Sequence, residues 1–183
     1  RQETEVEVLT SILDASNQQS IQDWTIRTTD HFGGVDILVV NAGGPPPGKF
    51  MDFTDEDWQA AFDMNLMSAI RMIREVVPSM AARGGGSILT VTSSSVKEPI
   101  DVLILSNVMR SGVTSLVKSL SLQLAPRNIR VNNLMPGRID TDRVRSIDEN
   151  QAKAAGISAE KRKAMSQATI PLQRYGTIED FGK

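Results

Sequence analysis

Two runs decide the fold: SILTVTSSS at residues 87–95 and SNVMRSGVTSLVKSLSLQL at residues 106–124. The first run is rich in β-branched residues and ends in hydroxyls, which predicts a short strand. The second run predicts a helix, because its apolar residues recur at helical spacing: Met109, Val113, Leu116, Val117, Leu120 and Leu124. Open parallel sheets bind ligands beyond the carboxyl ends of their strands. We therefore expect a functional site where the strand ends, at Ser93 to Ser95.

The same alternation of strand and helix patterns extends in both directions. Three further apolar runs predict strands, at 6–14, 35–40 and 129–134. Two further helices are predicted, at about 17–32 and 54–77, because a capping amide or hydroxyl begins each apolar stripe. This order of elements predicts an α/β protein with a doubly wound parallel sheet, helices on both faces and right-handed crossovers.

Composition limits the class of protein. The length of 183 residues predicts one domain, 1–183, that can bury a core. A net charge of -2 gives no general attraction for nucleic acid or an anionic membrane, and no apolar run approaches the roughly 20 residues of a membrane span. Without cysteine, and with His31 as the single histidine, no metal site is predicted. We expect a soluble, cytoplasmic protein with small-molecule partners, although the sequence leaves open a targeting signal before Arg1.

The strand and helix between residues 87 and 124 resemble those of the short-chain dehydrogenase/reductase family, most closely its 3-oxoacyl-acyl-carrier-protein-reductase-like members. That family has a serine at the strand end and, thirteen residues later, the tyrosine of a Tyr-x-x-x-Lys motif. Ser93 matches the serine, and the tyrosine and lysine positions fall on Ser106 and Arg110. The resemblance implies a Rossmann-like fold and predicts an atypical catalytic site at these three residues.

Asn65 lies inside the apolar stripe of the helix predicted at 54–77. A buried amide without a partner costs about 1 to 3 kcal/mol, so we expect its side chain to be hydrogen-bonded. The family's catalytic asparagine lies on this helix and holds a water of the proton relay, and the resemblance assigns the same role to Asn65. The alternative is an asparagine that bonds only to backbone groups.

Several cofactor-binding residues follow from the same resemblance. Asn41, Ala42 and Gly43 match the last three residues of the family's Asn-Asn-Ala-Gly, which lines the adenosine side of the cofactor cleft. Asp14 matches an aspartate that contacts the adenine amino group. Two alternatives stay open: a stiff proline-rich loop without a ligand after Gly43, and a turn aspartate that helps to start the next helix.

The C-terminal part matches the family at Pro136 and Gly137, and at Thr141, whose equivalent contacts the nicotinamide carboxamide. Thr141 can also cap the next helix. Residues 146–170 are helical in composition but show no convincing buried face. This combination suits a lid, which in the family selects the substrate.

The resemblance implies an oxidoreductase that uses NAD or NADP to move a hydride to or from a carbonyl or alcohol substrate, such as a 3-oxoacyl thioester. In the family the tyrosine is the general acid/base, but Ser106 is far less acidic than a phenol and Arg110 stays protonated. Three alternatives stay open: another proton donor (Lys97, Asp101 or a water held by Asn65), a slow enzyme, or an impaired protein that binds cofactor or a partner.

Two elements of the family pattern have no match in the sequence: the opening strand with its Gly-x-x-x-Gly-x-Gly turn, and the last strand. That turn brings the backbone close to the cofactor pyrophosphate. We therefore expect the chain to be part of a longer protein, and the choice between NAD and NADP stays open. Because the family pairs helices equivalent to 54–77 and 105–124 across a two-fold axis, a homodimer or homotetramer is expected.

Overall fold

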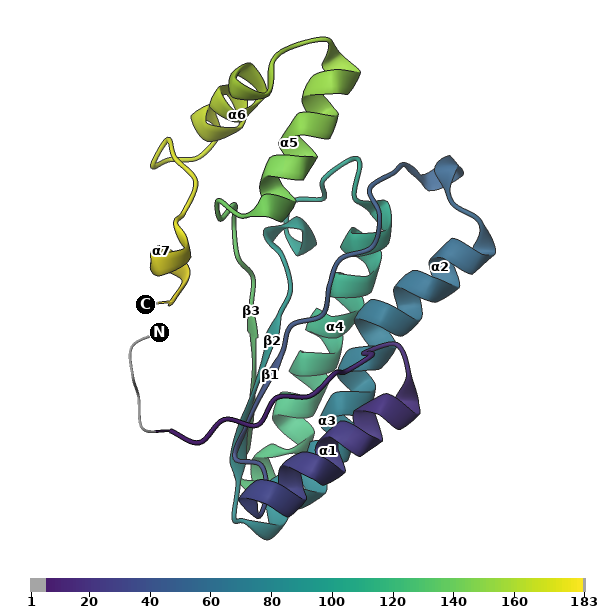
Figure 1. Ribbon diagram of the computed structural model, residues 1–183, viewed down its shortest axis with the longest axis vertical. Coiled ribbons are helices and arrows are strands. Elements are labelled where there is room, and N and C mark those ends of the chain that lie inside the picture. The colour runs from purple at the N-terminus through teal and green to yellow at the C-terminus, as the bar shows by residue number, and fades with distance from the viewer. Residues whose placement is uncertain (1–5, 183) are drawn as a thin grey trace. The chain divides into compact units, whose positions relative to one another are not determined.

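The computed structural model describes residues 6–182, which divide into two compact units with a boundary between Met135 and Pro136 (Figure 1). Residues 6–135 form the sheet unit, and residues 136–182 form the C-terminal helical unit. No helix within 6–182 is both long and apolar enough to cross a membrane.

The sheet unit is built on three parallel strands in the order β1-β2-β3: β1 (Ile37–Val40), β2 (Gly86–Val91) and β3 (Ile129–Leu134). Leu38 lies opposite Ile88, and Ile88 lies opposite Val131, so one face of the sheet carries a level row of apolar side chains. Parallel neighbours need a crossover connection, and helices supply both crossovers here. The strands predicted within 87–95 and at 129–134 are confirmed as β2 and β3, and the strand predicted at 35–40 begins two residues later than expected.

Helix α1 (Gln18–Phe32) begins and ends where the sequence predicts. The Asn17 side chain accepts a hydrogen bond of 3.0 Å from the Ser20 amide, which satisfies one of the unpaired donors of the first turn. Gly33 adopts a φ of +75°, and its amide donates to the Thr29 carbonyl at 2.8 Å.

The first crossover is interrupted. The sequence predicts one helix at 54–77, and the structure has α2 (Asp55–Ala61), a π-helical turn η2 (Phe62–Met67) and α3 (Ser68–Ala82). The predicted cap is present, since the Thr54 hydroxyl accepts from the Asp57 amide and the Asp57 carboxylate accepts from the Thr54 amide. A π turn inserts an extra residue into the helix, which is common near functional sites, and here it contains Asn65.

The second crossover is α4 (Ile104–Gln123). Its buried residues Leu105, Met109, Val113 and Val117 are spaced four apart, so they lie along one side of the helix as predicted. Short 3₁₀ turns complete the connections: η1 (Phe50–Asp52), η3 (Ser94–Val96) and η4 (Ala125–Arg127).

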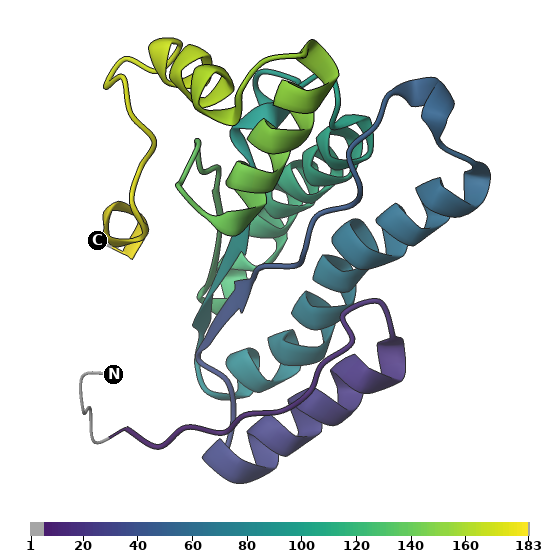
Figure 2. The same ribbon diagram turned by 45° about the horizontal axis from the view of Figure 1, so that its top comes forward.

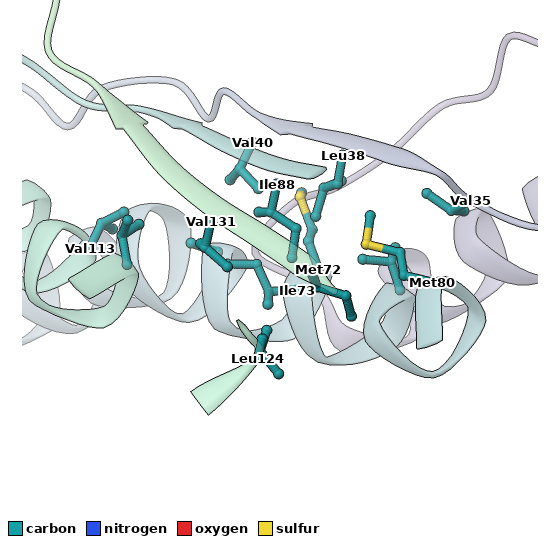
Figure 3. Close-up of a cluster of buried hydrophobic side chains, with 14 of the residues drawn as sticks. Val35, Leu38, Val40, Met72, Ile73, Met80, Ile88, Val113, Leu124 and Val131 are labelled. Carbon is teal, nitrogen blue, oxygen red and sulfur yellow. The ribbon is translucent and has the colours of Figure 1, made fainter. Parts of the chain in front are cut away.

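The main core lies between the sheet and helices α3 and α4. Figure 3 shows Leu38 and Ile88 of the strands on the side of the sheet that faces Met72 and Ile73 of α3. Helix α1 packs alongside α3, as both ribbon views show (Figures 1 and 2). This core fixes the carboxyl ends of β1 and β2 beside the first turns of α4.

Alternate residues of β1 point away from this core. Ile37 and Val39 are 70% and 56% exposed, whereas Leu38 and Val40 are buried. The parallel sheet with helical crossovers confirms the predicted Rossmann-like α/β class.

The prediction of a strand at 6–14 is wrong. Residues 6–14 have no regular secondary structure, and Val6, Val8 and Ile12 are all more than 60% exposed. A strand is stabilised by the hydrogen bonds of a neighbouring strand, and no strand of the described chain pairs with this segment. The apolar residues of this segment are spaced as in a strand, but none of the described strands pairs with it.

The C-terminal helical unit contains α5 (Asp142–Ala155), α6 (Ala159–Ala168) and α7 (Ile178–Gly182). The helices predicted within 146–170 are confirmed, although the first begins at Asp142. Two backbone hydrogen bonds tie the start of the unit to the segment before α7. The Gly176 amide donates to the Arg138 carbonyl at 2.9 Å, and the Asp140 amide donates to the Gly176 carbonyl at 2.8 Å. The buried residues of α5 and α6 are Asp148, Ala152 and Ser166, so the buried face of these helices is largely polar.

Candidate active site

Arg110 connects α4 to the carboxyl end of β2. Its Nη1 donates to the carbonyl oxygens of Val91 at 3.0 Å and Thr92 at 3.3 Å, and its Nε donates to Ser106 Oγ at 3.1 Å. Ser106 and Arg110 are four residues apart on one helical face, which explains why their side chains meet. The guanidinium therefore brings together the end of the strand and the first turns of the helix.

Ser106 is 7% exposed. Its oxygen accepts a hydrogen bond from a charged donor, and a hydroxyl also carries one proton that it can donate to an acceptor such as a substrate oxygen. Accepting from a cation polarises the hydroxyl and makes it a better donor.

Ser93 follows Thr92, whose carbonyl Arg110 binds. Its backbone is extended, and its Oγ accepts from the Ser95 amide at 3.1 Å, which caps the turn η3. Of the three serines at the strand end, Ser93 is half-buried, Ser94 is exposed, and Ser95 is buried. Arg110 binds Ser106 directly, and it also binds the carbonyl of Thr92, the residue before Ser93. The guanidinium therefore links the two ends of the segment that joins β2 to α4.

Asn65 is 5% exposed and lies in the π turn η2. Its Nδ2 donates to the carbonyl of Gly43, in the loop that follows β1. Its Oδ1 is buried and has no hydrogen-bond partner in the protein. The amide thus anchors the loop through one atom and presents an acceptor through the other.

A cavity of about 10 Å³ lies beside Asn65 and Arg110. This is about the smallest space that can hold one water molecule. Its walls come from the ends of β1 and β2, from the π turn and from α4, with these lining residues: Val40, Ala42, Asn65, Ala69, Thr90, Val91, Thr92, Arg110 and Val113. Asn65 and Arg110, which are distant in the sequence, therefore border the same space.

Four polar residues in or next to the cavity wall were not predicted as site residues. Thr90 and Thr92 each donate to the side chain of Asn133 on β3, at 2.9 and 3.0 Å. Thr114 on α4 accepts from the same Asn133 side chain at 3.0 Å. The available signal was the pair of hydroxyls at alternate positions of a strand whose other inward-facing residues are apolar.

The other proton donors considered from the sequence, Lys97 and Asp101, are exposed and do not line the cavity. Asp101 pairs with Lys49 at 3.5 Å. Next to this pair, the Gly48 amide donates to the Val102 carbonyl at 2.8 Å, which ties the loop after β1 to the loop after β2. Lys97 and Asp101 thus lie outside the cavity.

The cofactor-binding residues predicted in the sheet unit are accessible. Asn41 and Gly43 are exposed and Ala42 is half-buried. Asp14 is exposed beside a surface hollow of about 740 Å³ along α1. Hydrogen bonds from the hydroxyl and amide of Ser16, at 2.7 and 2.9 Å, hold the pKa of the Asp14 carboxyl below its ordinary value.

The remaining predicted cofactor residues lie in the C-terminal helical unit. Pro136 is half-buried and Gly137 is exposed at its start. Thr141 occupies the N-cap position of α5, but its side chain makes no capping hydrogen bond. The capping alternative for this hydroxyl is therefore wrong, because the backbone takes the cap position without it.

Tyr175, the chain's only tyrosine, is buried in the C-terminal helical unit at 4% exposure. Its hydroxyl donates to Asp148 Oδ2 at 2.7 Å, and Arg138 donates to Asp148 Oδ1 at 3.3 Å. Burial raises the pKa of the Tyr175 phenol. Within residues 6–182, no group of three His, Cys, Asp or Glu residues could hold a metal ion.

The comparisons with known proteins agree with this geometry. A family model described as Enoyl-(Acyl carrier protein) reductase matches residues 1–183. Dehydrogenase/reductase SDR family member 4 of Homo sapiens is 39% identical over 149 residues, which cover 81% of this chain and 50% of that protein. A putative ketoacyl reductase of the monensin polyketide synthase from Streptomyces virginiae is 33% identical over 171 residues, which cover 92% of this chain and 66% of that protein.

Solved structures share the fold. An NADPH-dependent reductase involved in bacilysin biosynthesis has a TM-score of 0.89 at 29% identity, covering 94% of this chain and 66% of that one. Actinorhodin polyketide ketoreductase with NADPH has a TM-score of 0.85 at 28% identity, covering 90% and 64%.

The fold, with polar groups gathered at the carboxyl ends of its strands, defines a Rossmann-like α/β protein. The chain belongs to the short-chain dehydrogenase/reductase family, in the group that the enoyl reductase model describes. It spans about half the length of the first curated relatives that it matches.

Proposed function

We propose that the protein containing this chain is an NAD(P)-dependent oxidoreductase with an atypical catalytic site. It moves a hydride between the nicotinamide and a small-molecule carbonyl or alcohol, such as a 3-oxoacyl thioester. Family membership supports the reaction class. The observation that carries the site is the cavity at the carboxyl end of β2, which Asn65 and Arg110 both line, together with the hydrogen bond from Arg110 to Ser106.

The residues present fit a dinucleotide, either NAD or NADP. The ionised, exposed carboxylate of Asp14 suits the amino group of an adenine. A Cβ atom at Gly43 would meet nothing within 4 Å, so the backbone there is open to a ligand. We assign Asn41, Ala42 and Gly43 to the adenosine side, and Pro136, Gly137 and Thr141 to the nicotinamide side. When bound, the nicotinamide would supply or accept the hydride.

Ser106 and Ser93 are proposed to hydrogen-bond the substrate oxygen. The Ser106 hydroxyl, backed by the Arg110 guanidinium, stabilises the negative charge that develops on that oxygen. Arg110 contributes its charge through Ser106, to which its Nε donates, while its Nη1 binds the Val91 and Thr92 carbonyls. The two serines and the guanidinium thus act as an electrostatic site.

The source of the catalytic proton distinguishes this site from the family pattern. An aliphatic hydroxyl is a much weaker acid than a phenol of pKa about 10, and Arg110 stays protonated. Tyr175 is bound to Asp148 with a raised pKa, which makes it a poor donor. We propose that water held at Asn65 Oδ1 delivers the proton, which agrees with the size of the cavity.

One observation favours a second function. Arg110 binds two backbone carbonyls as well as Ser106, which is the arrangement of a structural cation. An impaired family member that binds a cofactor or a protein partner would retain this arrangement without turnover. In either case we expect a homodimer or homotetramer built on the helical segments 54–77 and 105–124, as in the family.

Two successive measurements on the full-length protein distinguish between the two functions. NADH and NADPH binding is measured by fluorescence, and turnover is then measured on a panel of ketones and 3-oxoacyl thioesters. Binding with turnover that falls on Arg110→Met supports the enzyme. Binding without any turnover supports the second function, and the absence of binding contradicts both proposals as stated for a cofactor.

A further inference from the structure

Four polar side chains beneath the site form a connection that the proposed reaction does not use. Thr90 and Thr92 stand at alternate positions at the end of β2, Asn133 lies on β3, and Thr114 lies on α4 one turn after Arg110. Thr90 and Thr92 are 1% and 7% exposed. The connection therefore crosses the interior between the sheet and the helix.

The hydrogen bonds of this connection close into a ring. Asn133 Oδ1 accepts from the Thr90 hydroxyl at 2.9 Å and the Thr92 hydroxyl at 3.0 Å, and Asn133 Nδ2 donates to Thr114 Oγ1 at 3.0 Å. The Thr114 hydroxyl donates to the backbone carbonyl of Arg110 at 2.9 Å. The Arg110 side chain returns to the Thr92 carbonyl at 3.3 Å. Within the ring, Thr114 binds the backbone carbonyl of Arg110, and the Thr92 carbonyl binds the Arg110 guanidinium.

Stability alone is a weak reason for this ring. Its neighbours Val113 and Val131 are buried and apolar, and valine has nearly the shape of threonine. Replacing a buried polar network with apolar groups of similar shape is often neutral for stability. Hydrogen bonds, in contrast to apolar contacts, require particular directions. The ring specifies where the Arg110 turn of α4 lies against the end of β2.

We propose that Thr114 and Asn133 are positioning residues that keep the Arg110 guanidinium on the strand end and bonded to Ser106. Without the ring, the Arg110 turn is held by apolar contacts that permit small shifts and rotations. The guanidinium then leaves the Val91 and Thr92 carbonyls for part of the time, and Ser106 loses the donor that polarises it. The catalytic consequence rests on the proposed function, whereas the positioning itself does not.

The test compares Thr114→Val, which deletes the hydroxyl at constant shape, with Thr114→Ser, which retains it. In the full-length protein, the rate at which phenylglyoxal modifies Arg110 is measured by peptide mass spectrometry, with the urea unfolding midpoint measured in parallel. We expect Thr114→Val to raise the Arg110 rate about fivefold, as for the loss of one net hydrogen bond, and to lower the urea midpoint, because Asn133 Nδ2 loses its acceptor. Thr114→Ser should react like the parent protein.

Asn133→Leu breaks the ring at a second place and should raise the Arg110 rate in the same way. Arg83, which forms an exposed pair with Asp36, is the internal reference and should react equally in all variants. Equal Arg110 rates in the parent, Thr114→Val and Asn133→Leu would overturn the proposal. Parallel increases at Arg110 and Arg83 would also overturn it, because they indicate general loosening.

If the protein is active, Thr114→Val should lower kcat with little change in KM, and Thr114→Ser should restore kcat. The modification rates need no turnover. An inactive parent protein therefore contradicts the proposed enzyme, while the Arg110 rates still decide whether the ring positions the guanidinium.

Discussion

Each unit contains a polar cluster with an arginine, and the two clusters differ in how completely they are paired. In the C-terminal helical unit, Tyr175 and Arg138 donate to the two oxygens of the Asp148 carboxylate, while the buried Ser166 Oγ near Tyr175 has no hydrogen-bond partner. In the sheet unit, Asn65 Oδ1 is buried without a protein partner beside a cavity, and the Ser106 hydroxyl accepts from Arg110. A carboxylate that is paired at both oxygens, called here the closed cluster, stabilises a fold, whereas a buried acceptor without a partner beside a cavity is suited to bind a ligand.

The chain's only phenol, that of Tyr175, belongs to the structural cluster and not to the candidate active site. The family motif has its tyrosine at the position of Ser106, and the only tyrosine here completes the closed cluster instead. Three predictions test this division between a ligand-binding cluster and a structural one.

The largest effect is expected from the double change Ser106→Tyr with Arg110→Lys. If positions 106 and 110 face the nicotinamide, this change supplies the missing acid/base pair, and general acid/base catalysis contributes about 10²- to 10⁴-fold. The measurement is kcat/KM for reduction of a simple ketone by the full-length protein, together with cofactor affinity.

Each single change is the control for the double variant. Tyr beside Arg110 lacks the lysine that tunes it, and Lys beside Ser106 has no phenol to tune, so each should gain much less. A folded double variant that binds cofactor like the parent and shows no gain would mean that the two positions do not form a decayed family site.

The second effect concerns the closed cluster. Asp148→Ala leaves Arg138 and the Tyr175 hydroxyl without their shared acceptor, and breaking a buried pair typically costs about 3 kcal/mol. We expect faster amide exchange throughout α5 and a lower urea midpoint. Glu149→Ala, at the exposed neighbouring position, should leave both unchanged. Equal exchange in the two variants would remove the structural role assigned to Asp148.

The smallest expected effect is a loss of folding stability at alkaline pH. Burial raises the pKa of Tyr175 above its unfolded value, which is near 10, so the folded state keeps the phenol protonated where the unfolded state ionises. This stabilisation is complete below about pH 10 and is lost as pH rises through the folded pKa. The urea midpoint should therefore fall as pH rises above about 10, and Tyr175→Phe should reduce that fall. An unchanged pH profile in the variant would contradict the assignment.

Much of the secondary structure was predictable because its signals are local. The Asn17 and Thr54 caps, the stop at Gly33 and the apolar stripe of α4 each act within one or two helical turns. The strand expected at 6–14 failed for the opposite reason, since a strand depends on a partner that may be far away in sequence. The sequence also did not predict the π turn at Asn65, because the choice between i→i+4 and i→i+5 hydrogen bonds in one turn depends on the packing around it.

The candidate site divides in the same way. The sequence by itself determined the fold class, the positions of Ser93, Ser106 and Arg110 on a strand-helix connection, and the absence of a tyrosine there, because spacing and residue type carry this information. Only the tertiary structure decided that Arg110 binds the Val91 and Thr92 carbonyls, that Asn65 holds the Gly43 carbonyl, and that Asn133 closes a ring beneath them. These contacts join residues from different elements, and their geometry arises from how the sheet packs against α3 and α4, which no local pattern encodes.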